Sequence, residues 1–149
     1  MKIIVLKFGG TSVGSIDRIK KVAKIIKTYS KNYKVIVLSS AMSGMTNKLI
    51  NMSQKISSNF SDHEYDTLVS AGEQISCSLL AGQLLELGIN AKSWMAWQIP
   101  ILTEGPHKYS RIKYVNKKKI LKYLKVGGVP IISGFQGINK SSEITTIGR

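Results

Sequence analysis

The chain of 149 residues has little of what would hold a metal or stabilise a secreted fold. Cys77 is its only cysteine, so neither an intrachain disulfide nor a cluster of thiolate ligands can form. The two histidines, His63 and His107, are too far apart in sequence to indicate a metal site. No apolar run approaches the ~20 residues that cross a bilayer, and the first apolar run is too short for a signal peptide. These absences predict a cytoplasmic protein with no metal ligands of its own and no membrane partner.

Acidic residues are also scarce. The chain has 22 Lys and Arg residues against 8 Asp and Glu residues, which gives a net charge of +14. A basic surface attracts nucleic acid, but guanidinium groups come only from Arg18, Arg111 and Arg149. The lysines cluster where helices would expose them, with no ladder of aromatic side chains among them. We therefore expect a solvated lysine coat and no nucleic-acid partner. A basic nucleic-acid-binding module is an alternative that rests on charge alone.

A glycine-rich turn follows the first predicted strand. The apolar run from Ile3 to Leu6 leads into the segment Lys7 to Gly14 (KFGGTSVG), and an amphipathic helical pattern begins soon after it. Glycines let the backbone approach a phosphate, N–H groups at a helix N-terminus point toward it, and a lysine adds a positive charge. The spacing matches neither the Walker pattern nor the dinucleotide fingerprint. We interpret the segment as a phosphate-binding turn.

Helical and strand patterns alternate along the rest of the chain. Ser15 is predicted to cap the first helix, Thr46 or Asn47 the second, and Gly88 to end the longest helix, which is predicted over residues 64–87. Strands are predicted at residues 35–38, 91–95, 99–103, 129–133 and 144–147, with a hairpin loop at 139–143 and a further helix after Asn116. This alternation predicts one α/β domain whose sheet is largely parallel, with helices on both sides.

A carboxylate interrupts the apolar face of the longest predicted helix. At 100° per residue, Glu73 falls within about 40° of Val69, Cys77 and Leu80. A carboxylate buried alone costs on the order of several kcal/mol, so it needs a cation or several hydrogen-bond donors. In one interpretation, a lysine from another element reaches Glu73, or Glu73 lies at the edge of the apolar face. In the other, it faces a ligand that carries an ammonium group, for which residues 70–72 (SAG) would leave room.

Five segments occur in an order that resembles the aspartokinases. They are KFGGTSV at 7–13, LSSAMSGMTN at 38–47, SAGEQ at 70–74, GFQG at 134–137 and ITTIGR at 144–149. Aspartokinases are members of the amino-acid kinase family and phosphorylate the side-chain carboxylate of aspartate. The resemblance implies an α/β three-layer sandwich with a largely parallel central sheet, of the amino-acid kinase (carbamate kinase-like) type, here incomplete.

The resemblance implies a nucleotide side of the site. Lys7 resembles the catalytic lysine that neutralises the transferring phosphoryl group. The implied ATP-binding residues are Lys7, Phe8, Gly9, Gly10 and Ser40. The implied cofactors are ATP and Mg²⁺.

The resemblance also implies an aspartate side, formed by Thr46, Glu73, Phe135 and Arg149. Glu73 would pair with the ammonium group of L-aspartate, and Arg149 would hold a substrate carboxylate through a bidentate contact. The implied product is 4-phospho-L-aspartate, on the route to lysine, threonine, methionine and diaminopimelate.

The chain is shorter than the resemblance requires. In aspartokinases the Gly-Arg ending is followed by a Gly-Gly-Ser-Asp turn, the adenine-binding half of the kinase domain and two ACT-type regulatory domains. Residues 1–149 would supply the aspartate-binding side and the first phosphate loop, and we expect the isolated chain to be inactive. A homo-oligomer, or association with a missing C-terminal portion, is expected. The alternatives are a truncated, inactive aspartokinase fragment and another amino-acid kinase, acting on glutamate, carbamate or a nucleotide.

Overall fold

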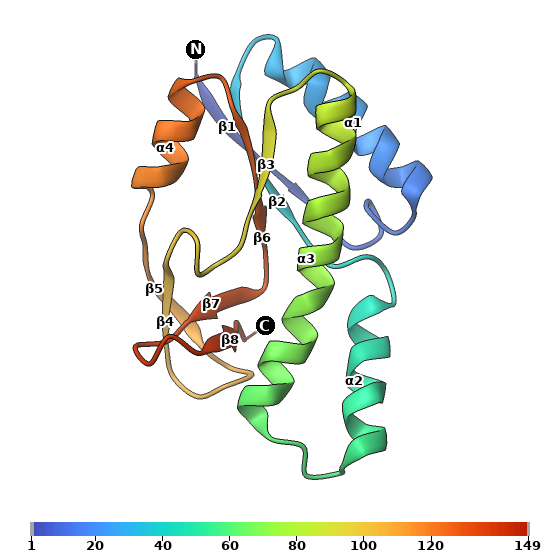
Figure 1. The fold of residues 1–149 in the computed structure, drawn as a ribbon, viewed down its shortest axis with the longest axis vertical. Helices are drawn as coiled ribbons and strands as arrows, with labels where there is room; N and C mark the ends of the chain where they lie inside the picture. Colours follow the sequence, from blue (N-terminus) through green and yellow to red (C-terminus); the bar gives the residue numbers. More distant parts are fainter. Residues whose placement is uncertain (1, 149) are drawn as a thin grey trace.

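The computed structural model describes residues 2–148, which form four helices and two four-stranded sheets (Figure 1). The helices are α1 (Ile16–Ser30), α2 (Met45–Ile56), α3 (Asp62–Glu86) and α4 (Lys118–Lys125). The strands are β1 (Ile3–Phe8), β2 (Lys34–Ser39), β3 (Ala91–Trp94), β4 (Ile101–Glu104), β5 (Arg111–Val115), β6 (Val129–Ser133), β7 (Gln136–Ile138) and β8 (Ile144–Thr146). Within this range, each helix lacks the combination of length and apolarity that crossing a bilayer requires.

The first sheet, which we call sheet A, is parallel throughout and has the order β1-β2-β6-β3. All four of its strands were expected. Val35 and Val37 of β2 are buried in the larger core cluster, whereas Ile36 packs against the smaller one. A strand with apolar contacts on both faces explains the unbroken hydrophobic run in its sequence.

Helices cover both faces of sheet A. Helices α1 and α3 lie on one face and α4 lies on the other (Figure 1). The larger core joins α1 and α3 to the sheet through residues such as Ile26 and Leu80, both fully buried. The smaller core places Ile120 and Leu124 of α4 against the opposite face. The predicted three-layer α/β sandwich is therefore confirmed.

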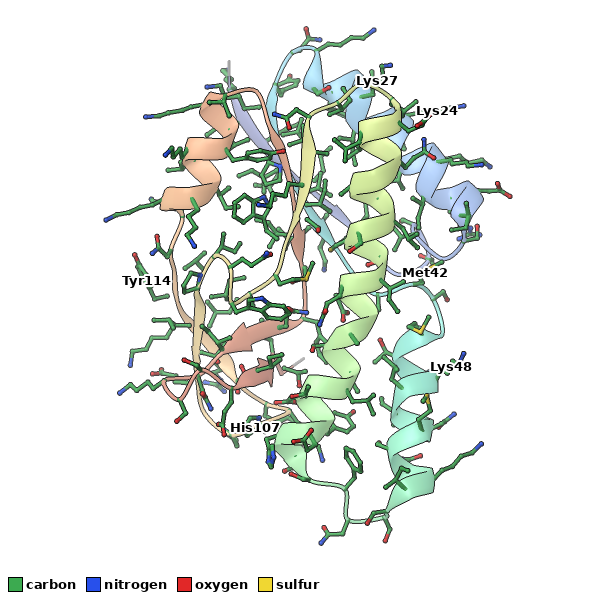
Figure 2. The ribbon with its side chains drawn as sticks, in the orientation of Figure 1. Lys24, Lys27, Met42, Lys48, His107 and Tyr114 are labelled. Carbon is green, nitrogen blue, oxygen red and sulfur yellow. The ribbon has the colours of Figure 1, made fainter. Side chains whose placement is uncertain are left out.

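The lysines of α1 and α4 are exposed, as the expected lysine coat requires. They are Lys20, Lys21, Lys24, Lys27, Lys118, Lys119, Lys122 and Lys125. Figure 2 labels two of those on α1, Lys24 and Lys27. The Nζ of Lys27 donates a hydrogen bond to the carbonyl oxygen of Leu87, at the end of α3 (3.0 Å).

The second sheet, sheet B, was not predicted as a separate sheet, although two of its strands, β4 and β8, were predicted at residues 99–103 and 144–147. Its order is β5-β4-β7-β8, and only its β4–β7 pair is parallel. Strand β5 (RIKYV) was missed although its residues alternate between polar and apolar, and all five are exposed, so the strand buries neither face. The predicted hairpin is confirmed: the Asn139 N–H donates to the carbonyl oxygen of Glu143 (3.0 Å) between β7 and β8. The expectation of a parallel sheet thus holds for sheet A alone.

Local signals identified two helix ends correctly and one wrongly. The Ser15 side chain accepts a hydrogen bond from the Arg18 N–H (3.3 Å) at the start of α1. Gly88, just after α3, has a φ of 76°, a conformation that favours glycine. Helix α2 begins after Gly44, whose φ is 78°, so the prediction that Thr46 or Asn47 caps it is wrong. Both residues lie in the first turn of α2 and line a cavity instead.

Strand β1 leaves one side of sheet A open. Among residues 2–148, no strand pairs with its outer edge. Ile3 and Val5, which point away from α1 and α3, are 48% and 59% exposed. An edge strand with exposed apolar side chains can pair with further polypeptide. This edge matches the incomplete sheet that was expected.

Gly137 of β7 has no room for a side chain. An added Cβ would lie 2.2 Å from Cγ2 of Thr103 and 2.9 Å from the carbonyl oxygen of Ile101. Gly137→Ala is therefore expected to lower the free energy of unfolding by about 1–3 kcal/mol, the usual cost of overpacking. Gly82→Ala is the control, because nothing lies within 4 Å of its Cβ and alanine favours a helix by about 1 kcal/mol. Urea unfolding measures both variants; equal stabilities would contradict the prediction.

Candidate active site

A cavity of about 560 Å³ lies at the carboxyl ends of β1, β2 and β6. Ligands of open α/β sheets bind at this edge. Of the nine residues predicted to form the site, six line the cavity: Lys7, Gly10, Ser40, Thr46, Glu73 and Phe135. They come from four separate segments of the chain, so the fold is what brings them together.

Lys7 and Glu73 reach this cavity from opposite faces of sheet A. Lys7 lies on the face of β1 that also carries Ile3 and Val5, whereas Glu73 belongs to α3 on the other face. Their side chains can share one cavity because it lies beyond the strand ends, where the sheet no longer separates the two faces. A cation and an anion therefore line the same space, as we expected from the sequence.

The loops after β1 and β2 are in direct contact at the cavity. The Ser43 N–H donates to the carbonyl oxygen of Gly10 (3.1 Å), and the Ser40 N–H donates to that of Phe8 (3.1 Å). A Cβ on Gly10 would lie 2.8 Å from the carbonyl oxygen of Ala41. Glycine at this position is what lets the two loops approach each other.

Two of the predicted site residues that the structure describes, Phe8 and Gly9, do not line the cavity. The Phe8 side chain packs against the larger hydrophobic core. The carbonyl oxygen of Gly9 accepts hydrogen bonds from the N–H groups of Ser12 (2.9 Å) and Val13 (3.3 Å), which closes the glycine turn. Arg149 lies outside the described residues. The roles expected for these three residues stay predictions.

Glu73 is buried, with 3% of its surface exposed, yet only part of its carboxylate is satisfied. Its Oε1 accepts a hydrogen bond from the Ala41 N–H (3.1 Å), whereas Oε2 has no hydrogen-bond partner among residues 2–148. Burial raises the pKa of the carboxyl from its ordinary 4.5 to about 7, and the Ala41 hydrogen bond opposes this shift. No lysine pairs with Glu73 in the described structure, so the first interpretation of this residue is not supported.

Small residues beside Glu73 make room for the protein itself. A Cβ on Gly72 would lie 2.9 Å from Cβ of Ala41 and 3.4 Å from Cγ of Met45. The space at Gly72 is thus filled by the loop after β2 and the start of α2, so the idea that it accommodates a ligand is wrong. Ser76, one turn after Glu73, donates to the carbonyl oxygen of Ser40 (2.7 Å) and fixes the same loop.

Phe135, Ile147 and Gly148 form another wall of the cavity. Phe135 has a φ of 63°, which is rare for a residue with a side chain, and its carbonyl oxygen accepts from the Ile147 N–H (2.9 Å). Ile147 and Gly148 line the cavity next to it, as do Ser43 and Asn47 from the β2–α2 loop and α2. None of these last four residues was predicted to form the site, although all lie in the quoted motifs.

The described residues contain no group of three or more His, Cys, Asp or Glu side chains placed to hold a metal ion. Among the described residues that line the cavity, Glu73 is the one that carries a carboxylate. The chemistry that this site can perform is therefore binding of a cationic group by Glu73 and of an anionic group by Lys7.

Comparison with known proteins places this site in a family. The sequence pattern described as the amino acid kinase family matches residues 2–149. The chain belongs to the amino acid kinase family. Among curated members of that family, it is 49% identical over 153 residues to the aspartokinase of Rickettsia conorii and 46% identical over 150 residues to that of Geobacillus stearothermophilus. Both alignments cover 100% of the chain, but only 38% and 37% of the two relatives.

Solved structures agree with this amino acid kinase assignment. The aspartate kinase from Synechocystis has a TM-score of 0.80 and 40% identity, over 100% of this chain and 24% of that one. The E. coli aspartokinase III in complex with aspartate and ADP shares the fold, with a TM-score of 0.85 at 22% identity over 100% and 44% of the two chains. The similarity to aspartokinases that the ordered motifs indicated is confirmed.

Burial of Glu73 predicts a dependence of stability on pH. Its pKa is about 7 in the folded chain and near 4.5 when unfolded, so the folded state binds the proton more tightly. Stability should therefore fall as pH rises from about 4.5 to 7, by up to about 3 kcal/mol, and stay lower above that range. Glu73→Gln removes this loss and should be more stable than the wild type at pH 8, with the gap closing toward pH 5.

Urea unfolding at several pH values measures this gap. Glu86→Gln is the control, because it removes an exposed acid from the same helix. A difference between Glu73→Gln and the wild type that stays constant from pH 5 to pH 8 would contradict the prediction.

Proposed function

We propose that this amino acid kinase forms part of an aspartate kinase, which transfers the γ-phosphoryl group of ATP to the side-chain carboxylate of L-aspartate. The observation that carries the proposal is the Glu73 carboxylate, which is buried in the cavity lining and whose Oε2 has no hydrogen-bond partner among residues 2–148. An ammonium group is the ligand that satisfies such an acceptor. Carbamate has no ammonium group, and the similarity to aspartokinases favours aspartate over glutamate.

In this mechanism, a side-chain carboxylate oxygen of aspartate attacks the γ-phosphorus, and the bond from that phosphorus to the β–γ bridging oxygen breaks. The products are 4-phospho-L-aspartate and ADP. The acceptor is already ionised, so no general base is needed. Catalysis then consists of positioning and charge neutralisation, which suits a site with one lysine and several backbone donors.

The proposed roles follow the two walls of the cavity. Lys7 neutralises charge on the transferring phosphoryl group, and the turn formed by Phe8, Gly9 and Gly10, with Ser40, holds the nucleotide phosphates. Glu73 binds the substrate ammonium. Thr46, Phe135 and Arg149 complete the aspartate side.

Mg²⁺ is expected to accompany ATP, but the residues described here do not form a site for it. Mg²⁺ is usually held by one or two carboxylates together with substrate phosphates. Glu73, the carboxylate available in the cavity, is buried and already accepts a hydrogen bond from Ala41. We assign no step of the mechanism to the metal.

The chain spans less than two fifths of the length of the curated relatives that it matches. We propose that residues 1–149 supply the aspartate-binding side and the first phosphate loop, that the ATP-binding half and ACT domains lie outside residues 1–149, and that these residues alone are inactive. We also propose that the chain associates with that remaining portion or with a second copy. A cytoplasmic location is part of the same proposal, as is a role in lysine and diaminopimelate biosynthesis.

Ligand binding tests the ammonium role of Glu73. Isothermal titration calorimetry should show that L-aspartate binds at least about tenfold more tightly than succinate, which differs by lacking the ammonium group. Glu73→Gln should abolish this preference, and Glu86→Gln should retain it. The affinity of the wild type for aspartate should rise as pH increases through about 7, where Glu73 ionises. Equal affinities for aspartate and succinate would contradict the proposal.

Phosphoryl transfer tests the role of Lys7. The chain is mixed with a polypeptide that supplies the following part of an aspartokinase, and ADP release is measured with and without aspartate. We expect aspartate-dependent ADP release only from the mixture, reduced on the order of 100-fold by Lys7→Ala. Lys24→Ala, which removes an exposed lysine on α1, is the control. A wild-type mixture without activity would favour the inactive-fragment alternative.

A further inference from the structure

A second buried carboxylate lies on α3, seven residues before Glu73. Asp66 has 0% of its surface exposed, and unlike Glu73 it is fully hydrogen-bonded. Its Oδ1 accepts from the Thr146 hydroxyl (2.6 Å) and from the Lys108 N–H (3.2 Å). Its Oδ2 accepts from the same N–H (3.0 Å) and from Nδ1 of His107 (2.8 Å). Because a carboxylate can only accept, Nδ1 of His107 carries the proton.

The donors to Asp66 come from two segments that are distant in sequence. His107 and Lys108 belong to the loop between β4 and β5, and Thr146 ends β8. Figure 2 shows His107 beside the N-terminal part of α3. Lys108 has a φ of 66°, a conformation that costs a residue with a side chain on the order of 1 kcal/mol. The hydrogen bonds to Asp66 stabilise the loop in this conformation.

These segments are bonded to the residues that form the cavity wall at 147–148. The Ser110 N–H donates to the carbonyl oxygen of Thr146 (3.1 Å), and the Gly148 N–H donates to that of Ser110 (3.0 Å). Ile147 and Gly148 line the cavity immediately after Thr146, and the Ile147 N–H is bonded to Phe135. Asp66 thus connects the wall at 147–148 to the helix that carries Glu73.

We propose that Asp66 is a positioning residue for the substrate site. By binding the Thr146 hydroxyl, the His107 imidazole and the Lys108 N–H, it sets the distance between Glu73 on α3 and the wall formed by Phe135, Ile147 and Gly148. A ligand held at one end by Glu73 and at the other by this wall requires that spacing. The inference concerns the aspartate site and therefore rests on the proposed function.

The adjacent threonine offers a matched control. Thr145 is 1% exposed and its hydroxyl shares a hydrogen bond with that of Thr103 (2.6 Å), also buried. Thr145 and Thr103 both belong to sheet B, so this bond does not reach α3. Thr145→Val and Thr146→Val each replace one buried hydroxyl by a methyl group on the same strand. They differ in whether the lost bond connects β8 to α3.

The test combines hydrogen exchange with titration of L-aspartate into the chain. Thr146→Val should speed exchange of the Ser110, Ile147 and Gly148 amides and weaken aspartate binding by about tenfold, as expected for a lost hydrogen bond to a charged group. Thr145→Val should leave the aspartate dissociation constant within about twofold of the wild type, because it breaks no connection to α3. Equal effects of the two variants on affinity and on these amides would overturn the proposal.

Substitution of Asp66 itself provides a rescue. An asparagine can accept from Thr146 and Lys108 through Oδ1 and donate through its amide to His107, once that imidazole changes tautomer. Asp66→Asn should therefore bind aspartate several-fold more tightly than Asp66→Ala. Should Asp66→Ala fail to fold, the comparison of Thr145→Val with Thr146→Val still tests the positioning role. A wild-type chain that does not bind aspartate would contradict the proposed function, whereas the exchange comparison would still test the positioning by Asp66.

Discussion

The hydrogen bond from the Ala41 N–H to Glu73 is the contact around which the site is arranged. It requires the loop after β2 to lie directly against α3, and the neighbouring small residues make this possible. Gly72 has no side chain that would displace Ala41, and Gly10 has none that would displace its carbonyl oxygen. Ser76 then secures the same loop through the carbonyl oxygen of Ser40. Backbone packing therefore brings the loops after β1 and β2 to the edge of the cavity that Glu73 lines.

The two buried carboxylates of α3, Asp66 and Glu73, differ in the number of hydrogen-bond donors around them, and this difference separates a structural role from a binding role. Asp66 is surrounded by donors from His107, Lys108 and Thr146, so it joins elements together. Glu73 receives one hydrogen bond, from Ala41, and its other oxygen has no partner within the described part of the chain. Burial raises its pKa to about 7. A folded protein can retain a buried carboxylate of this kind where a ligand supplies the missing hydrogen bond. Glu73 lowers the stability of the unliganded chain, and in our proposal the same carboxylate binds the substrate ammonium.

Sheet B positions one wall of the cavity. It places β8 and the residues after it against α3, so that the end of the described chain becomes a wall of the cavity. Phe135, with its φ of 63°, makes the sharp transition from sheet A to sheet B and lies in the same wall. The aspartate side proposed for the site is therefore built where the two sheets meet, whereas Lys7 and the glycine turn belong to sheet A.

The sequence by itself determined the strands of sheet A, the helices around it, the family and the presence of an acid on an apolar helix face. Hydrophobic periodicity and helix capping depend on neighbouring residues, so the sequence shows them directly. The family is visible because its short motifs occur in the sequence in a characteristic order. Two strands of sheet B, β4 and β8, were predicted, but β5 and the three-residue β7 were not, and nothing local shows that these four strands form a sheet of their own. The start of α2 was misplaced because Gly44 supplies a backbone conformation that the side-chain pattern does not show.

Only the tertiary structure decided that Ala41, rather than a lysine, satisfies one oxygen of Glu73, and that Asp66 links α3 to Thr146 across 80 residues of sequence. Contacts between distant segments depend on how the layers pack, which no local pattern specifies.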